Sequence, residues 1–165
     1  MNGAIFFSSR YGSTAQYAHW ISQATGLLVY DIKYNNADLS EYNFLVLGSP
    51  IIYYKLSIRK WVKKHMAKLA DKSIIFFSVS GAPAGSKLDR WIADSLPEDF
   101  ISRMHHVALR GRQIPKQLTW YDRMMLKIAG MTNKDPVARK QEFEGFDLMD
   151  KASITPILKL VGQLQ

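Results

Sequence analysis

The sequence predicts an α/β fold in three layers, a parallel β-sheet with helices on both faces, from two patterns. Four short apolar runs are continuous rather than alternating, which is typical of strands that are covered on both faces. These runs span residues 4–7, 27–30, 44–47 and 74–77. Segments with helical periodicity lie between them, so crossovers join successive strands and the strands run in the same direction. The 165 residues contain no internal repeat and fit a single domain over 1–165 with a sizeable core.

The remaining elements follow from apolar residues that recur at helical spacing. Helices are expected over residues 14–24, 57–69 and 87–96, and a weaker fifth strand over 107–109, starting at His105 at the earliest. A last helix is expected over 148–164. Pro156 either kinks this helix or starts a new helix that Thr155 caps.

The composition excludes several classes of site. The chain has no cysteine, which excludes disulfide scaffolds, thiolate zinc sites, iron–sulfur clusters and cysteine nucleophiles, and which fits a reducing compartment. The first residues lack the basic and long apolar regions of a signal peptide, and no segment approaches the roughly 20 apolar residues of a membrane-spanning helix. We therefore expect a soluble, cytoplasmic protein.

Positive charge is concentrated in one part of the chain. Residues 110–140 hold eight basic and two acidic side chains, whereas the rest of the chain is nearly balanced. We interpret this segment as an insertion before the last helix. Such a local excess indicates an anionic partner that docks at one place, and a solvated basic loop is the alternative. Nucleic acid is not expected as a partner, because no recognition motif is present.

The loop after the first strand suits an anion. In α/β sheets of this kind, ligands bind at the carboxyl ends of the strands. Residues 8–14 combine hydroxyl groups, a glycine and the start of a helix, where N–H groups and the helix dipole favour a phosphate. Neither a P-loop nor a dinucleotide-binding glycine motif occurs. An ordinary helix start is the alternative interpretation.

Two further loops can enclose a flat ring. Residues 48–54 supply apolar and aromatic side chains, and residues 78–85 supply glycines and backbone amides. A phosphate loop with two such loops is the arrangement that an FMN site requires. FMN itself carries the redox chemistry, so we expect no catalytic residue and no metal ligand. The predicted FMN-binding residues are Ser9, Arg10, Tyr11, Gly12, Ser13, Thr14, Ser49, Pro50, Ile51, Ile52, Tyr53, Ser78, Val79, Ser80 and Gly81.

These loops resemble those of the flavodoxin family over about the first 109 residues. A closer resemblance, over nearly the whole chain, is to the menaquinone-dependent protoporphyrinogen oxidases, a flavodoxin-like branch of haem biosynthesis. The shared features are residues 8–14, Ile51 with Tyr53, residues 61–65, Ser78-Val79, residues 108–110, residues 120–123, Met125 and Lys127. Ile52 and Tyr54 stand where that family usually has an arginine and a glycine.

The resemblance implies a flavodoxin-like three-layer sandwich with five parallel strands in the order 2-1-3-4-5. It implies one noncovalent FMN, whose phosphate is held by the first loop, and oxidation of protoporphyrinogen IX with electrons passed to a membrane quinone. The expected partners are therefore a quinone and a porphyrinogen, or a redox protein.

The basic segment contains a candidate surface helix. Over residues 120–131, a helix gathers aromatic, methionine and isoleucine side chains on one broad face and leaves two cations beside it. Such a helix resembles one that lies at the surface of an anionic membrane, and packing on the protein core is the alternative. The residues expected to dock substrate or membrane are Arg110, Arg112, Trp120, Tyr121, Arg123 and Lys127.

Three other functions stay open on the sequence. A flavodoxin-like electron carrier would use the basic segment to dock an acidic protein partner. A chain that has lost FMN would act as an interaction module. Reduction of a quinone by NAD(P)H is the third possibility, although no nicotinamide site is recognisable.

Overall fold

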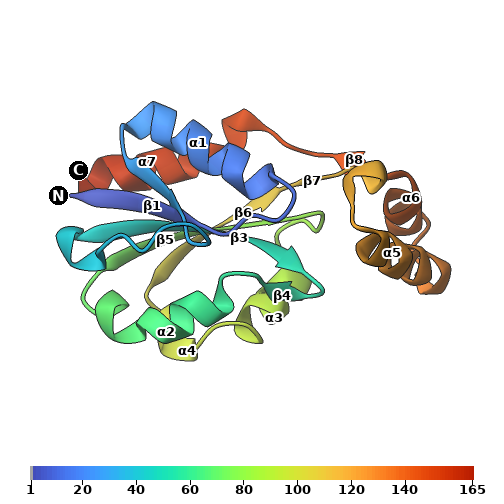
Figure 1. Ribbon diagram of the computed structural model, residues 1–165, viewed down its shortest axis with the longest axis horizontal. Helices are drawn as coiled ribbons and strands as arrows, with labels where there is room; N and C mark the ends of the chain where they lie inside the picture. The colour runs from blue at the N-terminus through green and yellow to red at the C-terminus, as the bar shows by residue number, and fades with distance from the viewer. Residues whose placement is uncertain (1) are drawn as a thin grey trace.

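The computed structural model describes residues 2–165 and contains a central sheet with five parallel strands. Their order is β2-β1-β3-β5-β6, which confirms the predicted order once the short β4 is set aside (Figure 1). The strands are β1 (Gly3–Phe7), β2 (Leu28–Asp31), β3 (Phe44–Ile52), β5 (Ser73–Ser80) and β6 (Met104–Arg110). Parallel pairing aligns their carboxyl ends at one edge of the sheet.

Two helical layers cover the sheet. On one face lie α1 (Ser13–Thr25) and α7 (Thr155–Leu164), and on the other lie α2 (Arg59–Leu69), α3 (Ser86–Ala93) and α4 (Glu98–Ile101) (Figure 1). Successive strand residues point to opposite faces, so each strand contributes to two cores. Phe77 packs with residues of α1 and α7, and Phe76 packs with residues of α2 and α3. Burial on both faces explains why the strands are continuous apolar runs.

The predicted last helix is wrong in its first part. Lys151–Ile154 form a short 3₁₀ turn, and α7 begins only at Thr155 with Pro156 in its first turn. Pro156 therefore starts a helix rather than kinking one, because its fixed φ suits a first turn. Thr155 does not cap α7: its hydroxyl donates to the carbonyl oxygen of Ala152 (2.7 Å).

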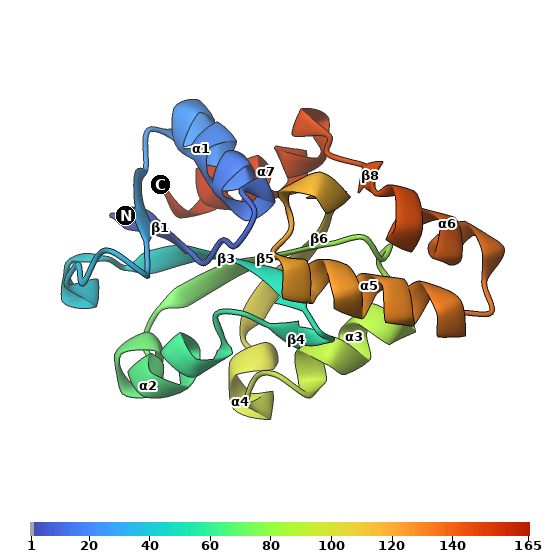
Figure 2. The ribbon, with the colours of Figure 1, turned by 45° about the vertical axis from the view of Figure 1, so that its right-hand side comes forward.

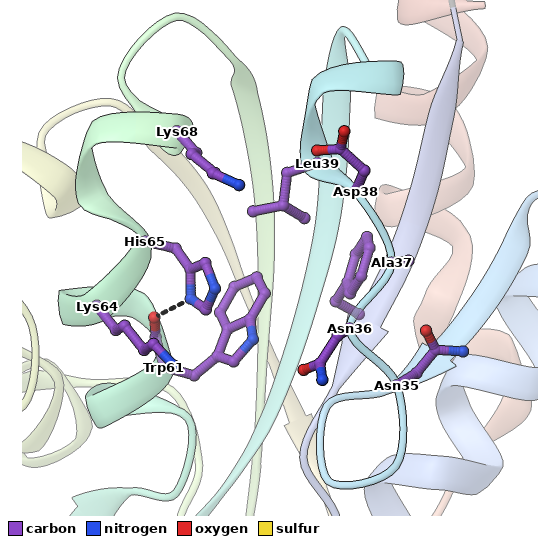
Figure 3. Close-up of a pocket in the computed structure, with 10 residues that line it drawn as sticks. Asn35, Asn36, Ala37, Asp38, Leu39, Trp61, Lys64, His65 and Lys68 are labelled. Atoms are coloured by element: carbon purple, nitrogen blue, oxygen red, sulfur yellow. Dashed lines mark hydrogen bonds between the residues drawn. The ribbon is translucent and has the colours of Figure 1, made fainter.

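The segment between β2 and β3 contains no α-helix within the described residues, only a loop with a 3₁₀ turn at Leu39–Glu41. A hollow of about 390 Å³ lies between this loop and α2. In Figure 3, Trp61, His65 and Lys68 of α2 face the loop across this hollow, and His65 Nδ1 lies 2.7 Å from the carbonyl oxygen of Trp61.

An insertion, residues 114–145, projects at the carboxyl edge of the sheet (Figures 1 and 2). It enters through β7 (Arg112–Gln113) and leaves through β8 (Phe146–Asp147), which pair antiparallel and which we call the stem. It contains a 3₁₀ turn (Pro115–Gln117) and two helices, α5 (Trp120–Thr132) and α6 (Pro136–Glu144), which pack on each other. The sequence predicts α5 but not α6, whose apolar residues form no clear stripe.

Across residues 2–165, no helix is both long enough and apolar enough to cross a lipid bilayer.

Candidate functional site

A carboxylate from the insertion lies against two loops at the carboxyl edge of the sheet. Asp122, on α5, is 6% exposed. Its Oδ2 atom lies 2.6 Å from a guanidinium nitrogen of Arg10 and accepts a hydrogen bond from the hydroxyl of Tyr11. Its Oδ1 atom accepts a hydrogen bond from the hydroxyl of Tyr53. We call Arg10, Tyr11, Tyr53 and Asp122 the Asp122 cluster. It joins the loop after β1, the loop after β3 and the insertion.

Tyr53 of the Asp122 cluster lies in a tight hairpin turn at the end of β3. β3 turns back on itself through Tyr53 and Tyr54 into β4 (Lys55–Leu56), with Ile52 paired to Lys55. Both tyrosines are left-handed, with φ of 50° and 64°. A two-residue hairpin turn with positive φ at both positions normally favours glycine or asparagine. Tyrosine is unusual there, and such strained residues concentrate at functional sites.

Tyr54 has its own contact. Its ring lies 5.3 Å from the ring of Trp91 on α3, measured between centroids. Tyr54 stands where the resembled family usually has a glycine, and its ring packs the hairpin against α3.

The start of α5 is arranged so that the Asp122 carboxylate is available. Thr119 caps the helix, and its side-chain oxygen accepts the backbone N–H of Asp122 (3.2 Å). In a capping box, an acidic side chain three residues after the cap returns to the cap's own N–H. Here the N–H of Thr119 instead donates to the hydroxyl oxygen of Tyr11 (3.3 Å), and the Asp122 carboxylate points to the sheet.

The cluster is charged at neutral pH. Burial raises the pKa of Asp122, but hydrogen bonds from Tyr11 and Tyr53 and the charge of Arg10 lower it, and the net pKa lies below the ordinary value of 3.8. Burial and the hydrogen bond to Asp122 raise the pKa of Tyr53 to about 12. The carboxylate is therefore an anion that accepts from a neutral phenol and a guanidinium.

The loop after β1 leaves hydrogen-bonding capacity unused. Gly12 precedes α1 with φ of 98°, and no side chain caps this helix within the described residues. Thr14, in the first turn of α1, is 1% exposed, and its hydroxyl has no hydrogen-bond partner among residues 2–165. Burial of a hydroxyl without a hydrogen-bond partner costs free energy, so the Thr14 hydroxyl is a candidate donor to a ligand.

At three of the other predicted site positions, the side chain is used within the fold. The hydroxyls of Ser49 and Ser78 serve the fold: Ser49 accepts the N–H of Ile58 (3.1 Å), and Ser78 lies 2.8 Å from Nε2 of His106. Val79 is buried in the core beside α7. At these positions only the backbone is available to a ligand. Gly81 lies against the ring of Phe146 in the stem, where a Cβ would come within 2.6 Å of that ring.

The predicted docking residues are used unevenly. Trp120 and Tyr121 are 75% and 49% exposed, so this face of α5 does not pack on the core. Arg123 donates to the carbonyl oxygens of Pro115 and Lys116 and holds the 3₁₀ turn. Arg112 pairs with Asp147 across the stem at 3.9 Å.

Arg110, at the end of β6, keeps a buried Nε that has no hydrogen-bond partner within the described residues. Its backbone carbonyl oxygen accepts the hydroxyl of Tyr17 (2.6 Å). The side chain of Arg110 therefore retains an unused donor at the carboxyl end of β6.

The sequence places Asp122 within the shared segment 120–123 and counts it among the acids of the basic segment, but it does not predict Asp122 as a site residue. Its contacts join residues 111 and 69 positions apart, which no local pattern can reveal. The one local signal is Thr119 three residues before an acid, the spacing of a helix cap.

Comparison with known proteins decides the family. The sequence model of the flavodoxin domain matches residues 4–138. The chain belongs to the flavodoxin family. No curated protein matches it.

Among solved structures, this flavodoxin-family chain is similar to a flavodoxin, WrbA-like protein from Agrobacterium tumefaciens. The two share 14% identity over 99% of each chain, with a TM-score of 0.53. It is also similar to a flavoprotein in complex with FMN from Lactobacillus acidophilus NCFM, at 13% identity over 66% of this chain and 91% of that chain, with a TM-score of 0.48. At 14% identity, the likeness to the Agrobacterium protein concerns the fold alone.

Proposed function

We propose that this flavodoxin-family chain binds one FMN at the carboxyl ends of β1, β3 and β5, and that the flavoprotein oxidises protoporphyrinogen IX with a membrane quinone as acceptor. The observation that carries the cofactor assignment is the buried hydroxyl of Thr14, which has no partner within the described residues. Membership of the flavodoxin family supports the same assignment.

The phosphate would lie at the start of α1. The donors there are backbone N–H groups without a side-chain cap and the hydroxyl of Thr14, both suited to a dianion. The residues that would hold the phosphate are Ser9, Arg10, Tyr11, Gly12, Ser13 and Thr14, with Arg10 and Tyr11 contributing backbone groups while their side chains contact Asp122.

The ring would lie between two loops. Pro50, Ile51, Ile52 and Tyr53 would flank one side, and the segment from Ser78 to Gly81 would flank the other through its backbone. When bound, FMN supplies a two-electron acceptor and donor, and the protein then has to bind, orient and exclude water.

The substrate assignment rests on the resemblance and is supported by the charge of the insertion. Oxidation of a porphyrinogen to a porphyrin removes six electrons and six protons, which reduces three quinones to quinols. The porphyrinogen carries propionates, and cationic donors such as Arg110 and Arg112 suit carboxylates. The apolar side chains exposed on α5 suit the lipid surface where a membrane quinone resides.

The first test is an absorbance spectrum of the purified protein before and after addition of FMN. We expect flavin bands at one FMN per chain. Thr14→Val removes the hydroxyl donor, and loss of a hydrogen bond to a charged group costs about 1.5–3 kcal/mol, which weakens FMN binding roughly 10- to 100-fold. The matched control is Thr132→Val at the end of α5, where the hydroxyl meets only the carbonyls of its own helix. A protein that cannot take up FMN would overturn the proposal and leave the interaction module.

The second test separates the enzyme from the electron carrier. The FMN-loaded protein is mixed with protoporphyrinogen IX and a soluble menaquinone analogue under exclusion of oxygen, with no other protein. Formation of porphyrin with consumption of the quinone supports the enzyme. Electron transfer that occurs only with an added redox protein contradicts it and supports the carrier.

A further inference from the structure

The partners of the Asp122 carboxylate form a set of donors. Arg10 contributes a guanidinium, and Tyr11 and Tyr53 contribute hydroxyl groups. A guanidinium with two hydroxyls around one pair of oxygens is a suitable receptor for any carboxylate, because charge-assisted hydrogen bonds to a carboxylate are among the strongest in proteins. All three donors belong to loops at the carboxyl edge of the sheet, where the proposed FMN would lie. The carboxylate that fills the receptor comes from the insertion.

The insertion has few other ties to the sheet. α5 packs mainly on α6, and its Trp120, Met124 and Ile128 side chains are exposed rather than packed on the sheet domain. The ion pair of the stem, Arg112 with Asp147, is exposed and long. Surface pairs of this kind contribute little to stability. The Asp122 cluster is therefore a main contact that holds α5 against the two loops.

Release of Asp122 would leave α5 intact. The helix start is capped by the hydroxyl of Thr119, which bonds the backbone of Asp122 and not its carboxylate. The receptor is also reachable, because the Arg10 side chain is 41% exposed while Asp122 is nearly buried. A carboxylate from solution can approach from the Arg10 side and take the place of Asp122.

We propose that Arg10, Tyr11 and Tyr53 bind a carboxylate of the substrate, and that Asp122 occupies this receptor until the substrate displaces it. The proposal rests on the proposed function for the identity of the substrate, whose propionates supply the carboxylate. It goes beyond that function, because it assigns the propionate site to the edge of the flavin pocket and gives the insertion the role of a lid. Binding of the substrate carboxylate exchanges one carboxylate for another and frees α5 from the sheet.

An internal competitor lowers the apparent affinity of the ligand. The observed Kd equals the intrinsic Kd divided by the fraction of molecules whose receptor is free. Removal of the Asp122 charge raises that fraction. Asp122→Asn and Asp122→Ala should therefore bind the substrate carboxylate more tightly, by about tenfold or more if the closed form dominates by that factor.

The experiment is a fluorescence titration of the protein with protoporphyrin IX, the stable oxidised porphyrin, and with its dimethyl ester, which lacks both carboxylates. We expect Asp122→Asn and Asp122→Ala to bind the diacid about tenfold more tightly and the ester unchanged. Glu144→Gln is the matched control, because it removes an exposed acid of the same insertion, and it should leave both affinities unchanged. Adding Arg10→Gln to Asp122→Asn should abolish the gain. Equal or weaker binding of the diacid by both Asp122 variants, or an equal gain for the ester, would overturn the proposal.

A second measurement needs no variant. In the unmodified protein, the diacid should increase hydrogen–deuterium exchange at the backbone N–H of Thr119, which donates to the Tyr11 hydroxyl in the closed form, and the ester should not. Unchanged exchange at saturating diacid would contradict displacement of Asp122. Circular dichroism establishes that each variant keeps its helices.

The source of the anion is resolved by titration with FMN. If Asp122→Asn tightens FMN binding and not porphyrin binding, the receptor takes the cofactor phosphate, and the proposed carboxylate site is wrong. Titrating porphyrin into protein without FMN also separates the two proposals. If the protein does not bind FMN but Asp122→Asn still binds the diacid more tightly, the proposed function is wrong and the carboxylate site is supported.

Discussion

Tyr53 and Asp122 are 69 residues apart in the sequence, and the tyrosine hydroxyl donates a hydrogen bond to Oδ1 of the aspartate. This contact connects a strained hairpin turn of the sheet to the first turn of an inserted helix. Because the same carboxylate also contacts Arg10 and Tyr11, one side chain couples helix α5 to two loops that lie far from it in the chain.

The ionisation of Tyr53 reports this contact directly. Burial and the hydrogen bond to Asp122 raise the pKa of Tyr53 to about 12, from an ordinary value of 10.0. An alkaline titration followed by ultraviolet absorbance should show a late step that Tyr53→Phe diminishes by one tyrosine. In Asp122→Asn the step should move to lower pH, because the negative charge that disfavours phenolate is gone. A late step of unchanged size in Tyr53→Phe would contradict the assignment.

The stability that Asp122 contributes should depend on pH in a defined direction. Its pKa is lower in the folded protein than the ordinary 3.8, so the unfolded chain takes up a proton first as the pH falls. The contribution is fully present well above pH 3.8 and is lost as the pH falls through the folded pKa.

Urea unfolding at a series of pH values checks this. At pH 7, Asp122→Asn should lower the free energy of unfolding by about 1.5–3 kcal/mol, the usual loss for hydrogen bonds to a charged group. The difference from the unmodified protein should shrink below pH 3.8. A difference that stays constant down to pH 2 would show that the charge of Asp122 is not involved.

Gly145 should tolerate no side chain. It ends α6 with φ of 81°, and a Cβ there would lie 2.4 Å from the carbonyl oxygen of Gln113 in the stem. We expect Gly145→Ala to cost about 1–3 kcal/mol from backbone strain and to disturb the pairing of β7 with β8. Gly162→Ala is the control, since within residues 2–165 no atom outside the neighbouring backbone of its own helix lies within 4 Å of a Cβ there, and alanine in a helix should be neutral or stabilising. Thermal unfolding compares them, and equal melting temperatures would contradict the clash.

The exposed face of the insertion should bind anionic vesicles. Trp120 and Met131 are 75% and 65% exposed on a helix flanked by cations. We expect the protein to sediment with vesicles containing phosphatidylglycerol, less so in high salt, and the double variant Trp120→Ser with Met131→Ser to lose this binding. Tyr34→Ser serves as control, because Tyr34 is 78% exposed outside the insertion. Equal sedimentation of the double variant and the control would exclude this face.

The sequence predicts the sheet because each strand is recognisable from the apolar pattern of its own residues. Each strand that is buried on both faces must be a continuous apolar run, so the four runs, with the helical segments predicted elsewhere in the chain, define the layers. The predicted strand over residues 44–47 continues to Ile52, because the hairpin at Tyr53 extends the pairing beyond the apolar run. Helix α6 has no apolar stripe, since it packs on α5 rather than on the main core.

The site is predicted less completely than the fold. Thr14 could be identified because it sits at the junction of a strand and a helix, where anions bind. The role of Asp122 depends on where the insertion folds back, and that is a tertiary property. The sequence also predicts that Ser49 and Ser78 bind FMN, but their hydroxyl groups form hydrogen bonds within the fold.

The insertion leaves and rejoins the flavodoxin domain at one point, because Gln113 and Phe146 are paired neighbours in the stem. A segment whose two ends already touch can be removed by a tight turn or moved to another scaffold without altering the path of the surrounding chain. Loss or gain of the whole appendage is therefore a single, topologically neutral event. The chain without it would keep its five parallel strands, with the donors of Arg10, Tyr11 and Tyr53 open to solvent.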